Sequence, residues 1–349
     1  MTNLNIAQIG VGRWGVNLLR VLTNHPNVSL VSICDVNIEA ARGLATANDT
    51  VVLNSIEDVI SMDNLDAVVI ASPSELHYDH VMAALAAKLH VFVEKPMALT
   101  AADALEMSIA AENNNVNLMV GHTFLYNNAV REVKSRIDSG ELGDIYFFTS
   151  RRLNLGQFRQ DCDVLWTLAP HDVSIIGYWM NAMPTSVSAQ GLAYANPELG
   201  LAEVCFAQLN FEVSQAAHLH LSWLNPQKCR EMVIIGSKKM LIYDDTQSDK
   251  IIQIFDKRVE TDYNDAAEDL TDFRSRLRAG DLVIPNIRMT EPLVAEMNEF
   301  VDSIIEGRRP LTDGRHGAEV VSVLDALSTS MQANGNTVSV NIPKNNLYG

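Results

Sequence analysis

The tripeptide Glu94-Lys95-Pro96 directly follows the apolar run of residues 90–93. Such a run is typical of a strand that is buried in a parallel sheet. Open α/β sheets bind their ligands beyond the carboxyl ends of their strands, so the ammonium of Lys95 is expected to meet a substrate in a site shielded from water. The alternative for this tripeptide, taken alone, is a solvated lysine at a strand end.

Three glycines near the amino terminus have the spacing of a loop that binds a dinucleotide. The apolar segment Leu4–Ile9 is predicted to be a strand, residues 10–15 read GVGRWG, and apolar residues then recur at helical spacing. In such a loop the first glycine permits a tight turn, the second lets the backbone approach a pyrophosphate, and the third lets helix and strand pack closely. The amino terminus of the helix attracts the anion. The cofactor contacts predicted from this loop are Gly10, Gly12, Arg13, Trp14 and Gly15.

An acidic residue, Asp35, ends the next predicted strand, Val28–Cys34. A carboxylate at that place can accept hydrogen bonds from both ribose hydroxyls, and it would repel a 2′-phosphate. NAD is therefore the predicted cofactor in preference to NADP. Arg13 and Arg42 are basic residues that could weaken this preference.

Strands and helices alternate through the first third of the chain, which predicts a doubly wound parallel sheet of the Rossmann type with right-handed crossovers. The turn with Ser72 and Pro73 is expected at the same sheet edge as the glycine loop, and therefore against the cofactor. For His77 two roles stay open: contact with the nicotinamide side of the cofactor, or the start of a helix. The predicted strands cover residues 67–71, 90–94 and 117–120, and the predicted helices cover residues 77–88 and 100–113.

Beyond residue 123 the buried runs give way to an alternation of apolar and polar residues, as in Ala217–Trp223. Alternation with short turns favours a large, mainly antiparallel sheet with one exposed face. We therefore predict an α/β protein with two domains, an NAD-binding domain at residues 1–123 and a second domain at residues 124–349. A late helix at residues 291–306 is expected to pack back on the first domain. The other elements predicted for the second domain are a helix at 128–139, strands at 145–149, 204–211, 216–223, 231–235 and 239–243, and a surface loop at 260–272.

The composition is that of a globular protein: 349 residues, 47% of them apolar, can bury the core of about two domains. A formal net charge of −17 opposes non-specific binding to nucleic acid or to an anionic membrane, but a local basic cluster could still hold a small anion. No signal peptide and no long apolar run is found, so a cytoplasmic location is expected. The cysteines are scattered, which argues against disulfides and against any metal site; they are Cys34, Cys162, Cys205 and Cys229.

Four motifs together resemble the glucose-fructose oxidoreductase and inositol dehydrogenase (GFO/IDH/MocA) family: GVGRWG at 10–15, EKP at 94–96, GH at 121–122 and LWTLAPHD at 165–172. The resemblance implies a Rossmann domain followed by an α/β domain, with assembly into homodimers or homotetramers through the outer face of the large sheet. It also implies that Lys95 and His171 form the catalytic pair. Glu94 and Lys95 are assigned to the cofactor contacts as well.

Three further segments are similar to the bacterial nucleotide-sugar 3-dehydrogenases, which oxidise the C3 hydroxyl of UDP-N-acetylglucosamine or of its uronic acid. These segments are RRLNLG at 151–156, LAPHD at 168–172 and GSKKMLIYDD at 236–245. The likeness implies a nucleotide-linked sugar as the substrate.

The chemistry of such a reaction suits the two residues of the pair. Removal of a hydride from a carbinol requires the hydroxyl proton to leave, and a neutral imidazole at His171 can accept it near neutral pH. Lys95 would bind the same oxygen and stabilise the developing alkoxide. Asp172 has two candidate roles, orienting His171 or capping a helix at residues 173–180, and the second needs no catalytic reason.

Three arginines, Arg151, Arg152 and Arg159, precede the histidine motif, and guanidinium forks suit a diphosphate. Asn154 and Gln157 could then hydrogen-bond the sugar. The alternative is that these arginines pair with surface acids.

Thr167 stands four residues before His171, where much of the family has an aspartate. A threonine can hydrogen-bond a substrate hydroxyl but cannot act as a base at neutral pH. Two rival functions therefore stay open. One is an inositol or glucoside dehydrogenase or a keto-sugar reductase, without a nucleotide on its substrate. The other is a sensor that binds NAD without turnover.

Overall fold

The protein is described by a computed structural model over residues 3–45, 50–156, 158–212, 214–261 and 275–342. Gln157 and residues 262–272 of the acidic stretch lie outside the described residues.

The described chain forms two compact units. Residues up to Asn127 build the first unit together with Thr290–Asp325, and the second unit consists of Asn128–Met289 and Ala326–Val340. The division expected from the sequence, near residue 123, differs in that Thr290–Asp325 packs with the first unit. The sequence predicts this return for the late helix within that segment.

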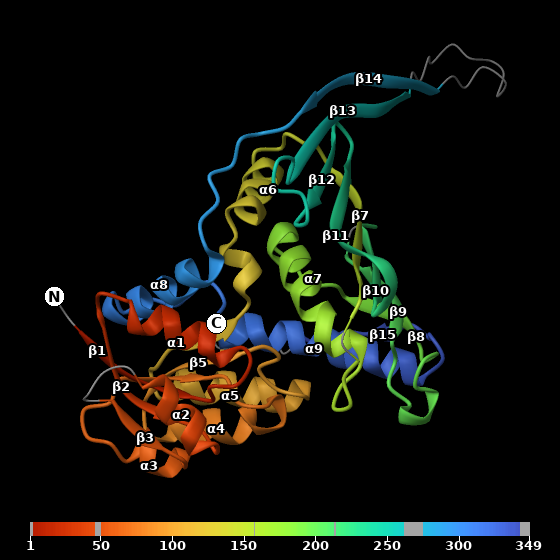
Figure 1. Ribbon diagram of the computed structural model, residues 1–349. Helices are drawn as coiled ribbons and strands as arrows, with labels where there is room; N and C mark the ends of the chain where they lie inside the picture. The colour runs from red at the N-terminus through yellow and green to blue at the C-terminus, as the bar shows by residue number, and fades with distance from the viewer. Residues whose placement is uncertain (1–2, 46–49, 157, 213, 262–274, 343–349) are drawn as a thin grey trace. The chain divides into compact units, whose positions relative to one another are not determined.

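The first unit contains a parallel sheet whose six strands, among the described residues, run in the order β3-β2-β1-β4-β5-β6. Four of these strands, β1, β2, β3 and β5, are labelled in Figure 1. The central strands β4 and β5 bury almost every side chain, which explains their unbroken apolar sequence. This is the Rossmann sheet that the sequence predicts. The strands are β1 (Leu4–Ile9), β2 (Val28–Cys34), β3 (Val51–Leu53), β4 (Ala67–Ile70), β5 (His90–Glu94) and β6 (Leu118–Gly121).

Three helices of this unit begin where the sequence supplies a capping side chain. The side chains of Asn37, Ser55 and Thr100 accept hydrogen bonds from backbone N–H groups in the first turns of α2, α3 and α5. These helices and their neighbours are α1 (Gly15–Thr23), α2 (Ile38–Leu44), α3 (Ile56–Ile60), η1 (Ser74–Leu76), α4 (His77–Ala86), α5 (Ala101–Asn113) and η2 (Thr123–Tyr126).

Helix α8 (Pro292–Ile305) joins the first unit through its apolar face. It packs on α1 and η2, and it buries Leu293, Met297 and Phe300. The ring of Phe300 meets Phe92 of β5 edge to face, with 5.8 Å between ring centroids. Helix α9 (Gly314–Gln332) follows, and the boundary between the two units falls within it.

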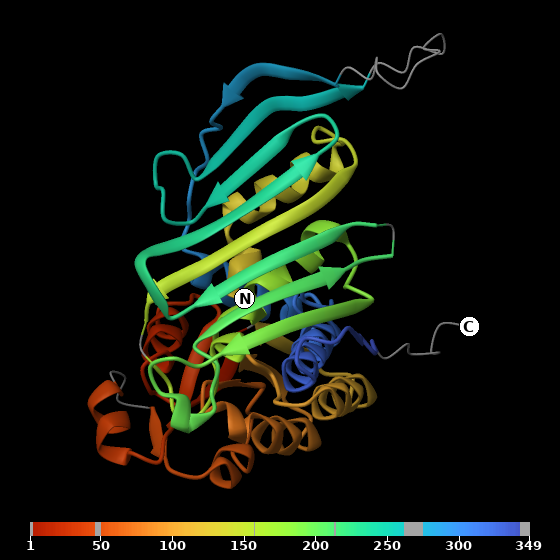
Figure 2. The same ribbon diagram turned by 90° about the vertical axis from the view of Figure 1, so that its right-hand side faces the viewer.

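The second unit contains a mixed sheet whose nine strands, counted among the described residues, run in the order β14-β13-β12-β11-β7-β10-β9-β8-β15. Only β7 and β10 pair in parallel, so the sheet is mainly antiparallel, as predicted. Figure 2 shows one face of the sheet, and helices α6 (Asn128–Asp138) and α7 (Val164–Met180) lie behind it. The strands are β7 (Ile145–Leu155), β8 (Ser186–Leu192), β9 (Val204–Asn210), β10 (Ala216–Ser222), β11 (Leu224–Gly236), β12 (Met240–Asp244), β13 (Ile252–Thr261), β14 (Ser275–Val283) and β15 (Val338–Ser339), with η3 (Pro197–Leu199) before β9.

Helix α7 begins earlier than predicted. The sequence suggested a helix at 173–180 with Asp172 as its cap, but the helix starts at Val164 and the cap is Asp163, whose side chain accepts from the Trp166 N–H. The misleading residue is Pro170, which lies inside the helix although it lacks an N–H for the Trp166 carbonyl. Asp172 therefore lies in mid-helix and cannot be an amino-terminal cap.

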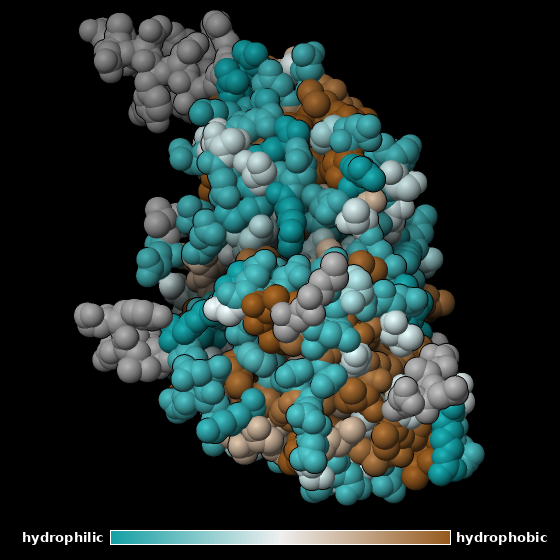
Figure 3. Space-filling model, turned by 90° about the vertical axis from the view of Figure 1, so that its left-hand side faces the viewer, coloured by the Kyte–Doolittle hydropathy of each residue, from teal (hydrophilic) through white to brown (hydrophobic). Residues whose placement is uncertain are grey.

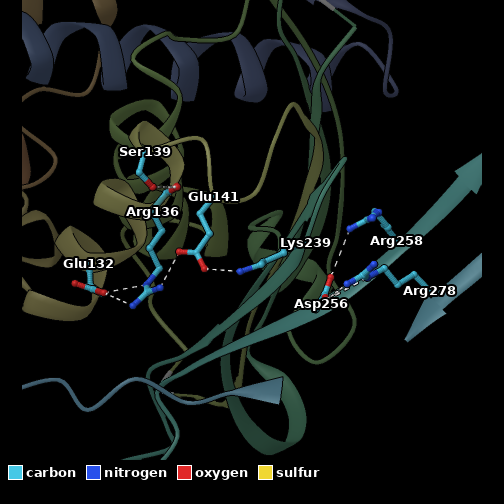
Figure 4. A network of polar contacts seen from close by, with 8 residues as sticks. All are labelled: Glu132, Arg136, Ser139, Glu141, Lys239, Asp256, Arg258 and Arg278. Carbon is cyan, nitrogen blue, oxygen red and sulfur yellow. Dashed lines mark hydrogen bonds and ion pairs between the residues drawn. The ribbon is translucent and has the colours of Figure 1, made fainter. Parts of the chain in front are cut away.

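A chain of ion pairs ties α6 to the turn between β11 and β12 (Figure 4). Arg136 bonds Glu132 of its own helix and Glu141, and Glu141 accepts from Lys239 at 2.7 Å. The same view shows that Asp256 of β13 forms ion pairs with both Arg258 and Arg278. Because most of these groups are partly exposed, each pair contributes at most about 1 kcal/mol.

The surface drawn in Figure 3 is covered largely by hydrophilic residues, with separate hydrophobic areas between them. No helix in the described ranges has both the length and the apolar character of a membrane span. Within the same ranges, no three His, Cys, Asp or Glu side chains come together in a group that could hold a metal ion.

Candidate functional site

The glycine loop between β1 and α1 has the geometry that a dinucleotide needs. Gly10 has a φ of +91°, and a Cβ there would lie 2.6 Å from the carbonyl group of Ala71. A Cβ at Gly15 would collide with the carbonyl oxygen of Gly10, whereas at Gly12 nothing lies within 4 Å. Two glycines are thus required by close packing, and the third leaves open space beside the backbone. A diphosphate fits this arrangement.

Asp35 is held at the end of β2 by two backbone groups. Its Oδ2 accepts from the Val11 N–H and its Oδ1 from the Asn37 N–H, both at 2.8 Å. Each carboxylate oxygen retains a further lone pair for a ribose hydroxyl. Arg42, which the sequence raised as a partner for a 2′-phosphate, pairs with Glu39 at 2.8 Å.

His77 is buried at the start of α4. Its Nδ1 lies 2.8 Å from the Pro96 carbonyl oxygen and its Nε2 lies 2.9 Å from the Ser72 carbonyl oxygen. Burial lowers the pKa of His77, and the two carbonyl contacts oppose that shift. The imidazole thus begins its helix and links two loops, with both ring nitrogens beside backbone carbonyl oxygens. Ser72 itself contacts His80 through its hydroxyl, at 3.0 Å.

Glu94 connects the glycine loop to the segment of Lys95. Its Oε1 accepts from the indole N–H of Trp14 at 2.6 Å, and its Oε2 accepts from the Lys95 backbone N–H at 3.2 Å. Burial raises the pKa of Glu94 to about 7, and the positive charge of Lys95 opposes the shift. Gly121 makes room for this carboxyl group, because a Cβ there would lie 3.0 Å from the carboxyl carbon. The glycine of the GH motif is thereby explained.

The histidine of that motif, His122, is buried beside His316 of α9. The two imidazole rings meet edge to face with 5.2 Å between centroids. Burial lowers the pKa of both rings, that of His316 to about 4. The rings are therefore neutral at neutral pH, and they add no positive charge around Lys95.

Glu296 is a second buried carboxyl group near Glu94, and the sequence analysis did not single it out. Its side chain is fully buried, Oε2 accepts from the Thr123 hydroxyl at 2.7 Å, and Oε1 has no hydrogen-bond partner among the described residues. Burial, and then the charge of Glu94, raise the pKa of Glu296 well above its ordinary value. Glu94 has the N–H donors and the adjacent lysine, so Glu94 loses its proton before Glu296 as the pH rises. A signal did exist, because Glu296 falls on the helical stripe of Leu293, Met297 and Phe300.

In the second unit, Arg152 and Asp172 are partners of each other. Arg152 of β7 donates from Nε and Nη2 to Oδ1 of Asp172 at 2.9 and 2.6 Å, and both side chains are buried. Asp172 Oδ2 and the Tyr243 hydroxyl nearby find no hydrogen-bond partner in the described part of the chain. Arg152 therefore pairs with an acid, as one alternative from the sequence had it, but this acid is buried, and the pair joins β7 to α7. His171, the next residue on the helix, is half-buried.

The remaining residues predicted to contact the substrate have partners of their own. Arg151 lies 3.5 Å from Glu231 on the neighbouring strand, and Arg159 donates to Asp161 at 2.9 Å, so the pairing with acids that the sequence left open is realised for both. The Thr167 hydroxyl donates to the Asp163 carbonyl at 2.9 Å. Asn154 is exposed on β7.

Comparison with known proteins bears on these observations. Residues 4–122 match the model of an oxidoreductase family with an NAD-binding Rossmann fold, and residues 130–242 match a GFO/IDH/MocA C-terminal domain. A 4-carboxy-2-hydroxymuconate-6-semialdehyde dehydrogenase of Sphingobium is 30% identical over 231 residues, which cover 64% of this chain and 73% of that protein. An inositol 2-dehydrogenase of Salmonella paratyphi B is 32% identical over 183 residues, 50% of this chain and 53% of that protein.

Solved structures share the fold over nearly the whole chain. A levoglucosan dehydrogenase in complex with NADH and L-sorbose superposes with a TM-score of 0.81 at 19% identity, covering 98% of this chain and 100% of that one. A UDP-N-acetylglucosamine 3-dehydrogenase from Acidithiobacillus ferrooxidans superposes with a TM-score of 0.75 at 22% identity, covering 95% and 100%. At these identities the likeness establishes the fold and leaves the substrate open.

Proposed function

Since the chain belongs to the GFO/IDH/MocA family of NAD-binding oxidoreductases, we propose that it passes a hydride between a sugar carbinol and NAD. The substrate that we propose is a UDP-N-acetylhexosamine or its uronic acid, reacting at C3. The observation that carries the proposal is the contact of Trp14 with Glu94, which joins the glycine loop to the segment that bears Lys95.

NAD would be held by the residues of the first unit. The open backbone at Gly12 and the amino terminus of α1 suit the diphosphate, and Asp35 suits the ribose hydroxyls. The same carboxylate would repel the 2′-phosphate of NADP, so NAD is preferred. The nicotinamide, when bound, would accept the hydride. Side chains of the protein would accept the proton of the substrate hydroxyl.

Lys95 and His171 divide that task in the proposed mechanism. The ammonium of Lys95 binds the reacting oxygen and stabilises the negative charge that develops on it. The imidazole of His171 accepts the hydroxyl proton. Thr167 cannot share in proton transfer, because its hydroxyl is no base at neutral pH and donates to its own helix.

The choice of a UDP-sugar rests on the likeness of segments 151–156, 168–172 and 236–245 to nucleotide-sugar 3-dehydrogenases, and on the fold shared with one of them. The second candidate is a free sugar or polyol. It is favoured by the acidic partners of Arg151, Arg152 and Arg159, which already occupy guanidinium groups expected to bind a diphosphate.

We further propose that the protein assembles as a homodimer or homotetramer through the face of the nine-stranded sheet that α6 and α7 leave uncovered. Phe147 and Phe206 are support for this, because both are large, apolar and exposed.

The substrate and Lys95 can be tested in one assay, which follows the absorbance of reduced nicotinamide. The purified protein is mixed with NAD and either UDP-N-acetylglucosamine, its uronic acid or myo-inositol. We expect reduction of NAD with a UDP-sugar only, and a loss of roughly 10²-fold to 10³-fold in kcat for Lys95→Met, which should still bind NAD. Reduction with myo-inositol alone would favour the second candidate, and a fully active Lys95→Met enzyme would contradict the mechanism.

A further inference from the structure

Gln8 is a polar residue in the middle of an apolar strand. It lies on β1 between Ala7 and Ile9, it is fully buried, and in the sheet it pairs with Ile33 on one side and Val69 on the other. A buried amide is costly unless its hydrogen bonds are made. What Gln8 bonds to therefore indicates what its side chain does.

The amide nitrogen of Gln8 spans the glycine loop. Nε2 donates to the Gly10 carbonyl at 2.9 Å and to the Gly15 carbonyl at 2.7 Å, so both of its hydrogens are used. The opposite orientation of the amide would place Oε1 against two carbonyl oxygens with no hydrogen between them. Oε1 finds no hydrogen-bond partner among the described residues. The orientation is thus set by the two carbonyl groups of the loop.

Each of these carbonyl groups belongs to a peptide plane that is also held at its other end. The Val11 N–H, in the same peptide as the Gly10 carbonyl, donates to Asp35 at 2.8 Å. The Val16 N–H, in the same peptide as the Gly15 carbonyl, donates to the Gly12 carbonyl at 3.3 Å. Gln8 thereby completes the restraint of two peptide planes, one on each side of the open backbone at Gly12.

From this geometry we propose that Gln8 is a positioning residue for the diphosphate of the dinucleotide. Its amide turns the carbonyl oxygens of Gly10 and Gly15 toward the strand and away from the open side of the loop, where an oxygen would repel a phosphate. The proposal rests on the NAD binding of the proposed function, and it adds a residue that touches no ligand itself.

The test compares ligands that contain a diphosphate with one that does not. Gln8→Met keeps the length of the side chain and removes both donors. We expect its Kd for NAD and for ADP to rise on the order of tenfold, while its Kd for adenosine stays at the wild-type value. At saturating NAD the kcat should stay within about twofold of wild type, because the change acts on binding alone. A general loss of stability would instead raise the Kd for all three ligands, adenosine included.

Val69→Ala is the matched control, because it removes buried volume beside Gln8 but touches neither carbonyl group. Its three Kd values should equal those of the wild type. Gln8→Glu is the second variant. Its carboxylate would face two carbonyl oxygens, so its Kd for ADP should exceed that of Gln8→Met and should fall as the pH is lowered and one donor returns.

Amide hydrogen exchange across residues 10–16 without any ligand separates this proposal from the proposed function. Gln8→Met should exchange faster than both the wild type and Val69→Ala. Equal exchange in the two variants, or an unchanged Kd for ADP in Gln8→Met, would overturn the role of Gln8. Failure of the wild type to bind NAD would refute the proposed function, while the exchange rates would still decide on Gln8.

Discussion

Glu296 and Glu94 illustrate how two carboxyl groups share one buried region without both being charged. Glu94 receives two N–H groups and faces Lys95, whereas Glu296 receives one hydroxyl and lies fully buried on α8. Burial and the charge of Glu94 raise the pKa of Glu296 well above that of an unfolded glutamate, which is about 4.3. Glu296 therefore keeps its proton in the folded state over a pH range in which the unfolded chain loses it.

The sign of the resulting pH dependence follows from linkage. Below about pH 4.3 both states are protonated, and Glu296 contributes no dependence. As the pH rises from there toward the raised pKa, the free energy of unfolding falls by up to about 1.4 kcal/mol per pH unit on account of Glu296. Glu94, with a pKa of about 7, adds a fall of its own that ends near neutral pH.

Glu296→Gln should remove the contribution of Glu296 to the pH dependence of the free energy of unfolding. A glutamine keeps the hydrogen bond from Thr123 and has no proton to lose. We expect the variant to match the wild type near pH 4 and to become progressively more stable than it toward pH 8. Urea denaturation at a series of pH values measures this. Glu198→Gln, at an exposed glutamate of η3, is the control and should follow the wild-type curve. Parallel curves for wild type and Glu296→Gln would show that Glu296 is ionised in the folded protein.

At the scale of single elements, the pair of Arg152 and Asp172 shows what joins β7 to α7. Side chains with exposed fractions of 8% and 1% hold opposite charges here, so either charge without the other would be buried and uncompensated. Asp172→Asn should therefore destabilise the protein by about 3–5 kcal/mol, whereas the double variant Arg152→Met with Asp172→Leu should recover most of that loss.

A double-mutant cycle by urea denaturation measures the coupling energy between Arg152 and Asp172. An activity assay of the double variant tests whether Arg152 also binds the substrate, as the sequence suggested. If Arg152 only joins the two elements, the double variant should keep the wild-type KM for its sugar substrate. A KM for a UDP-sugar that rises at restored stability would instead return Arg152 to the substrate site. Val233→Ala, on the facing strand β11, serves as a control for small changes in packing.

The elements also show where sequence reasoning succeeds. The strand β5 was predicted within a residue because its buried centre has an unbroken apolar run. The bounds of β1 and β2 were also predicted, although Asn5 and Gln8 interrupt the apolar sequence of β1 and two serines interrupt that of β2. The start of α7 was wrong because a proline inside a helix is read as a boundary. The pairing of Arg152 with Asp172, and of Glu94 with Glu296, depends on which elements face each other, and no local pattern in the chain states this.

At the scale of the whole molecule, the sequence motifs and the family comparison both indicate an oxidoreductase that binds NAD. The glycine loop, Asp35 and the alternation of strands and helices predicted an NAD-binding Rossmann domain, and the match over residues 4–122 confirms it. Thr290–Asp325 packs with the first unit, and the sequence predicted this only for the helix near the start of that segment. The rest of the segment could not be assigned, because its place depends on contacts between residues far apart in the chain. The sugar is not specified by fold or family, because closely similar folds act on different substrates.

Assembly through the large sheet makes a prediction at the same scale. In β9, Cys205, Ala207 and Leu209 are buried on the side where α7 packs, so Phe206 projects to the opposite face. There its ring stacks on His220 of β10 with 4.4 Å between centroids, and 47% of the residue stays exposed. Because only about half of the residue is still exposed, burying this ring against a second copy would stabilise an assembly by about 1 kcal/mol per ring.

Phe206→Asp should therefore shift the protein toward smaller species, because each interface would have to bury an unpaired carboxylate. Sedimentation velocity over a range of protein concentrations measures the shift. The affinity for NAD should be unchanged, since the glycine loop and Asp35 belong to the first unit. Leu199→Asp, at an exposed apolar residue of η3 outside the sheet, should leave the assembly intact. A wild-type protein that sediments as a monomer at every concentration would exclude assembly altogether, and an unchanged Phe206→Asp oligomer would place the interface on another surface.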